Sequence, residues 1–84
     1  MANWYKMLED EFALNGDVFA DMICTRTEDE LKEEFDPGYG REEGKPFTAW
    51  GEKYVYFPVC YDGSEWVSSV PRNPCSLHTC HIGG

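Results

Sequence analysis

The stretch from Phe47 to Arg72 constrains the fold more than any other part of this sequence. Aromatic and β-branched runs are separated there by two segments of turn-forming residues, Trp50-Gly51-Glu52-Lys53 and Tyr61-Asp62-Gly63-Ser64, a pattern typical of β-hairpins. The second segment centres on Asp62-Gly63, which suits a two-residue type I′ turn. The cross-strand pairs that this turn sets are Val59–Trp66, Phe57–Ser68 and Val55–Val70. We therefore expect a three-stranded antiparallel meander, with these paired residues on the face that meets the helices.

A first helix is expected near the N-terminus. It begins after Asn3, whose side chain can cap it, and Asn15-Gly16 is typical of a helix end. The apolar residues of this segment recur at four-residue spacing: Trp4, Leu8 and Phe12. The β-branched content of Asp21–Arg26 is compatible with a brief additional strand.

The second helix is marked by a capping box, with Thr27 at the N-cap and Glu30 reaching back from the third helical position. Its only large apolar residues, Leu31 and Phe35, are one turn apart, so we expect the helix to continue to Phe35 and to end, after about two turns, at Asp36-Pro37-Gly38-Tyr39-Gly40. The carboxylates that it shows to solvent are Asp29, Glu30, Glu33 and Glu34.

The length of 84 residues allows one domain. The predicted fold class is α+β, with two short helices packed on a three-stranded antiparallel sheet that becomes four-stranded if residues 21–26 join it. Pro71 and Pro74 end the last strand. Residues 1–74 are therefore expected to form the domain, and residues 75–84 a flexible C-terminal tail.

The acidic residues are concentrated in one half of the chain. Residues 1–43 hold 13 of the 16 carboxylates against four cationic side chains, residues 44–84 hold three of each, and the formal net charge is −9. Such a surface repels nucleic acid and anionic lipid, and it attracts basic partners. We therefore expect neither direct nucleic-acid binding nor membrane binding as a main function.

The N-terminus carries no apolar run of signal-peptide length, and no segment has the roughly 18 to 20 apolar residues that span a bilayer. This pattern predicts a cytoplasmic protein, in which the cysteines are thiols or metal ligands. A catalytic cysteine needs a positive neighbour that stabilises its thiolate and a donor site for an oxyanion, whereas these cysteines lie in expected strands or in the flexible tail. No catalytic residue is assigned, and no enzymatic activity is expected.

The tail sequence Cys75-Ser76-Leu77-His78-Thr79-Cys80-His81 contains four cysteine and histidine residues that can bind zinc. Cys80 and His81 are adjacent and cannot easily face one ion, so the pattern is a poor match to known zinc modules. A tail that folds back on the sheet could gather Cys60, Cys75, His78 and Cys80. A zinc-stabilised interaction or regulatory module is therefore the alternative hypothesis, and the preferred one involves no cofactor.

Four segments of the sheet region and the residues after it carry a resemblance: Phe47–Gly51, Tyr54–Pro58, Tyr61–Val67 and Val70–Pro74. On these segments the chain resembles uncharacterised small acidic proteins of phages and mobile elements of Firmicutes, and the resemblance covers most of the chain, including the acidic helix. Many short acidic mobile-element proteins inhibit host defence nucleases, so the resemblance implies such a role by association.

The preferred hypothesis is an inhibitor of a host nucleic-acid-binding defence enzyme, of anti-CRISPR or anti-restriction type. In this hypothesis a DNA-mimicking surface places carboxylates where the enzyme expects phosphates. The partner is then a basic protein that binds DNA or RNA. The carboxylates predicted to contact it are Glu28, Asp29, Glu30, Glu33, Glu34, Asp36, Glu42 and Glu43.

Overall fold

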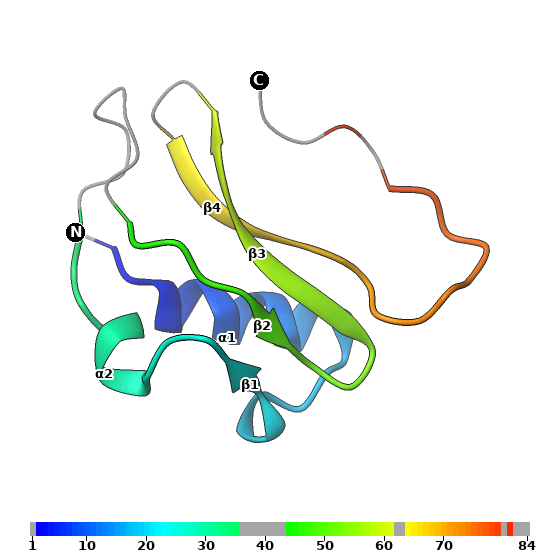
Figure 1. Ribbon diagram of the computed structural model, residues 1–84, viewed down its shortest axis with the longest axis horizontal. Helices are drawn as coiled ribbons and strands as arrows, with labels where there is room; N and C mark the ends of the chain where they lie inside the picture. Colours follow the sequence, from blue (N-terminus) through cyan, green and yellow to red (C-terminus); the bar gives the residue numbers. More distant parts are fainter. Residues whose placement is uncertain (1, 36–43, 62–63, 80, 82–84) are drawn as a thin grey trace.

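The structure is a computed structural model of the 84-residue chain, and it describes residues 2–35, 44–61, 64–79 and 81. Along the chain its elements are α1 (Trp4–Asn15), the 3₁₀ helix η1 (Phe19–Asp21), β1 (Ile23–Cys24), α2 (Glu28–Leu31), β2 (Ala49–Trp50), β3 (Tyr54–Tyr61) and β4 (Ser64–Pro71). The strands form one antiparallel sheet, and α1 lies against one of its faces (Figure 1). The fold class is α+β, as predicted.

The sheet has the strand order β1-β2-β3-β4. The brief strand expected within residues 21–26 is therefore present, and it makes the sheet four-stranded. The β3–β4 hairpin has the predicted register, because the structure pairs Val59 with Trp66, Phe57 with Ser68, and Val55 with Val70. The Asp62-Gly63 turn itself lies outside the described residues.

Helix α1 begins and ends where the sequence predicts. The Asn3 side chain accepts a hydrogen bond from the backbone N–H of Lys6 at 2.8 Å, which satisfies one of the unpaired donors of the first turn. Gly16 ends the helix in the left-handed conformation, at a φ of 73°, where a Cβ atom is strained. The helix buries its predicted apolar stripe: Trp4, Leu8 and Phe12.

Helix α2 has the predicted capping box but is shorter than expected. It ends at Leu31, so the prediction of a helix to Phe35 is wrong. The backbone N–H and C=O of Phe35 are both bonded to Ala2, at 2.8 Å each, and are not available to a helix. This bridge places the Phe35 ring 4.7 Å from the ring of Trp4, where it joins the core without being helical.

The prediction of which sheet face meets the helices is also wrong. Tyr56 is fully buried and stacks on Phe12 with ring centroids 4.1 Å apart, and Val67 is 3% exposed. The residues expected on this face lie on the other one, where Trp66 is 39% exposed. Both faces of the hairpin are apolar, so alternation does not distinguish them. Tyr56 can occupy the core because its hydroxyl donates a hydrogen bond to Asp17 at 2.7 Å and is not buried unpaired.

Beyond β4 the chain has neither helix nor strand in its described part, and residues 72–79 and 81 are exposed. The flexibility of residues 75–84 stays a prediction. Within the described residues, no helix is long and apolar enough to cross a membrane.

Candidate protein-binding surface

Five of the eight predicted carboxylates lie on α2 and on the three residues that follow it. Glu28, Asp29, Glu33 and Glu34 are exposed and Glu30 is half-buried. Because α2 is one turn long, these side chains do not form the two-turn helical row that the sequence suggests. The other three predicted carboxylates, Asp36, Glu42 and Glu43, lie outside the described residues.

Glu30 has a structural role in addition to its charge. Its carboxylate accepts the backbone N–H of Thr27 at 3.1 Å and pairs with the Arg26 guanidinium at 3.1 Å. The hydrogen bond from the Thr27 backbone, together with Arg26, holds the pKa of Glu30 below its usual range. Glu30 therefore helps to fix the start of α2.

Two of the remaining carboxylates are paired with lysines at the surface. Glu28 lies 3.5 Å from the ammonium of Lys32, and Glu33 lies 2.8 Å from that of Lys45. Asp29 and Glu34 form no ion pair with any described residue. These two side chains are the ones most available to a cationic partner.

Helix α1 adds carboxylates to this surface, which the sequence reasoning did not assign to it. Glu9 follows Tyr5 by four residues, which places both on one flank of the helix. Tyr5 lies beside α2, because the Lys32 ammonium is 4.7 Å from the centre of its ring. Hydrogen bonding with the Glu28 carboxylate raises the pKa of the Tyr5 hydroxyl, and Glu9 contributes in the same direction. Glu9 therefore lies on the flank of α1 that carries Tyr5, and Tyr5 lies beside Lys32 and Glu28.

A groove of about 410 Å³ lies between α1, η1, β1 and α2. Its apolar lining includes Phe19, Met22 and Leu31, and its polar lining includes Arg26 and Glu28. The Phe19 ring contacts Tyr5 edge-on, at 5.1 Å between centroids, and contacts Phe12 in the same way at 5.3 Å. The groove has the volume of a small-ligand site. The sequence reasoning missed it, because η1 gives no periodic signal and sets the position of Phe19.

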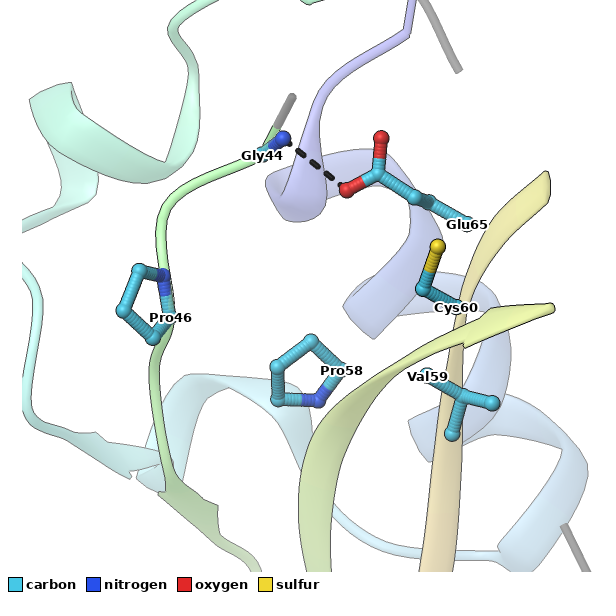
Figure 2. A pocket seen from close by; sticks show the side chains of 6 residues that line it. All are labelled: Gly44, Pro46, Pro58, Val59, Cys60 and Glu65. Carbon is cyan, nitrogen blue, oxygen red and sulfur yellow. Dashed lines mark hydrogen bonds between the residues drawn. The ribbon is translucent and has the colours of Figure 1, made fainter. Parts of the chain in front are cut away.

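A smaller pocket, of about 120 Å³, lies between the residues that lead into β2 and the part of the hairpin where β3 ends and β4 begins. Figure 2 shows the Glu65 carboxylate accepting the backbone N–H of Gly44 at 2.9 Å, with the Cys60 side chain nearby. Pro46 and Pro58 line the same pocket. Its volume is below the roughly 300 Å³ of typical small-molecule sites.

The structure keeps two of the candidate zinc ligands, Cys60 and Cys75, apart. Cys60 pairs with Glu65 beside the turn of the hairpin, whereas Cys75 follows Pro71 at the other end, roughly 20 Å away along the strand. Cys75 is exposed, and Cys80 lies outside the described residues. In the part of the chain that the structure describes, no group of three or more Cys, His, Asp or Glu side chains is placed to hold a metal ion.

Comparison of the chain with protein-family models, with curated proteins and with solved structures found no match.

Proposed function

We propose that this protein binds a basic host protein that itself binds DNA or RNA, and inhibits it by occupying the nucleic-acid site. The observation that supports this proposal most is the exposed acidic surface on α2 and on the residues after it. Asp29 and Glu34 are exposed and form no ion pair with any described residue. Glu28 and Glu33 are also exposed and extend the same region.

The net charge of −9 favours this kind of partner. A nucleic-acid-binding protein holds the phosphates of DNA or RNA with the lysine and arginine side chains of its binding site. A dense carboxylate surface is attracted to the same side chains of that partner. Such a complex forms fast and weakens steeply as salt increases. The resemblance to small acidic proteins of phages and mobile elements agrees with a defence enzyme, of CRISPR or restriction type, as the target.

The test is capture of bacterial proteins on the immobilised full-length chain, at low and at high salt, with DNA as a competitor. A nucleic-acid-binding protein that is retained at low salt, released by salt and displaced by DNA supports the proposal. Retention that neither salt nor DNA reverses contradicts it, as does the absence of any nucleic-acid-binding protein among those retained.

A matched pair of variants locates the contact surface. Glu34→Lys and Glu52→Lys change the net charge equally, and both positions are exposed, but Glu34 follows α2 whereas Glu52 lies between β2 and β3. We expect Glu34→Lys to weaken binding at least roughly tenfold, because the new lysine is repelled by the positively charged binding site of the partner. Glu52→Lys should have a much smaller effect. Equal losses for the two variants would show that only the overall charge matters.

A further inference from the structure

The groove between α1, η1, β1 and α2 has the chemistry of a site for one positively charged side chain. Phe19 and Met22 give it apolar walls, Glu28 places a carboxylate at its margin, and Tyr5 adds an aromatic ring. Lysine and arginine side chains combine an apolar stem with a charged end. A groove with an apolar wall and an acidic, aromatic margin is complementary to both parts.

The protein's own Lys32 shows that an ammonium group is stable at this margin. Its Nζ atom lies 4.7 Å from the centre of the Tyr5 ring and 3.5 Å from the Glu28 carboxylate. Both contacts are with groups that line the groove, and both Lys32 and Glu28 are exposed. A cation from outside can therefore approach the same two groups.

Arg26 also lines the groove, but its guanidinium is bound to groups of the protein. Its guanidinium pairs with Glu30 at 3.1 Å and donates to the backbone carbonyl of Pro46 at 2.8 Å. These contacts offset the positive charge of Arg26. Among the residues that line the groove, Glu28 carries the carboxylate that remains, and an incoming cation competes with Lys32 for it.

We propose that this groove anchors one lysine or arginine side chain of the basic protein partner, with the stem against Phe19 and Met22 and the charged end between Glu28 and the Tyr5 ring. This inference rests on the proposed function, since it names the feature of the partner that the acidic surface recognises. It adds a defined pocket to what is otherwise a diffuse electrostatic attraction.

The groove can be tested without the partner, using short peptides and the full-length protein. The probes are the acetylated and amidated tripeptides Gly-Lys-Gly, Gly-Arg-Gly and Gly-norleucine-Gly, where norleucine keeps an apolar stem and lacks the charge. We expect the lysine and arginine peptides to shift the backbone amide signals of Phe19, Ala20 and Met22 in a saturable way. Single side chains bind weakly, so dissociation constants on the order of 1–10 mM are expected. Equal shifts from the norleucine peptide, or no saturable shift from the charged ones, would overturn the proposal.

Two variant pairs sharpen the test. Ala20 lines the groove and Ala13 lies on the exposed side of α1, so Ala20→Phe should abolish peptide binding and Ala13→Phe should leave it unchanged. Lys32→Ala removes the internal competitor, whereas Lys53→Ala makes the same charge change at an exposed position between β2 and β3. We expect Lys32→Ala to tighten peptide binding roughly threefold, the size expected for one exposed ion pair, and Lys53→Ala to have a smaller effect. Peptide affinities that do not differ within each pair contradict the proposal.

The same variants separate this inference from the proposed function. If Ala20→Phe still captures the basic partner as the unmodified chain does, while Glu34→Lys does not, the acidic surface is functional and the groove is not its anchor. If no nucleic-acid-binding protein is captured by the unmodified chain, the proposed function fails, and peptide binding in the groove then has to be explained by a different partner.

Discussion

At the scale of single residues, Asp17 links the end of α1 to the sheet. Its carboxylate accepts the backbone N–H of Lys53 at 3.0 Å, the backbone N–H of Tyr54 at 3.2 Å and the hydroxyl of Tyr56 at 2.7 Å. A Cβ atom at Gly51 would collide with this carboxylate. The side chain is therefore enclosed, and its three hydrogen-bond partners all donate to it.

We expect Asp17→Asn to lower the free energy of unfolding by about 1–3 kcal/mol. The amide replaces one accepting oxygen with an NH₂ group, which cannot accept a hydrogen bond from the N–H or O–H group that faces it, so a buried donor is left unpaired. Urea denaturation followed by tryptophan fluorescence measures the change. Asp21→Asn is the control, since Asp21 is exposed on η1, and it should shift the midpoint very little. Similar losses for the two variants would mean that Asp17 contributes only its charge.

Tyr56 predicts how stability depends on pH. Burial, and next the hydrogen bond with Asp17, raise the pKa of its hydroxyl, whereas an unfolded tyrosine ionises near pH 10. The folded state therefore favours the neutral phenol, and this contribution is complete below about pH 10 and lost as the pH rises further. We expect the free energy of unfolding to fall above about pH 10, and Tyr56→Phe to show a flatter decline. Urea midpoints between pH 8 and pH 11 test this, and parallel curves for the two proteins contradict it.

At the scale of elements, the two faces of β4 differ in what they contribute to stability. Val67 belongs to the core, whereas Val70 is half-buried on the opposite face of the same strand. We expect Val67→Ala to lower the free energy of unfolding by about 2 kcal/mol and Val70→Ala by less than about 1 kcal/mol. Chemical denaturation of the two variants gives the comparison. A larger loss at Val70 would mean that the helices cover the face that the sequence reasoning chose.

The parts of the fold that the sequence predicts are those that depend on local chemistry. Asn3 and Gly16 bound α1, Thr27 and Glu30 form the capping box, and the register of the hairpin follows from its two-residue turn. The packed face and the end of α2 depend on distant contacts instead. Tyr56 is drawn into the core by Asp17, which lies 39 residues earlier in the chain, and no periodicity reports such a bond.

The candidate site divides in the same way. The acidic region could be located from the sequence, because Asp29 and Glu34 are exposed by their places on and after a capped turn. The groove could not, because its walls come from η1 and β1, whose three and two residues carry too little pattern. The cation contact at Tyr5 was equally hidden, since it joins a residue of α1 to Lys32, which directly follows α2.

At the scale of the whole molecule, repulsion between carboxylates competes with a few exposed ion pairs. Lys6 lies 3.4 Å from Glu9 and 3.3 Å from Asp10, and the pairs made by Lys32 and Lys45 are also at the surface. Exposed pairs of this kind contribute about 0–1 kcal/mol each. With a net charge of −9, the unpaired carboxylates repel one another, and the range of this repulsion is long when the salt concentration is low. Repulsion should therefore be the larger of the two effects.

This balance predicts that salt stabilises the protein. Raising NaCl from about 10 mM to about 100 mM shortens the screening length from about 30 Å to about 10 Å, which weakens long-range repulsion more than it weakens pairs in contact. We expect the melting temperature to rise by a few degrees, which for a domain of this size corresponds to about 0.5–1 kcal/mol. Thermal unfolding followed by circular dichroism measures it. The double variant Asp29→Asn/Glu34→Gln removes two unpaired charges and should show a smaller rise. A melting temperature that falls with salt would mean that the ion pairs, and not the repulsion, dominate the electrostatics of the folded state.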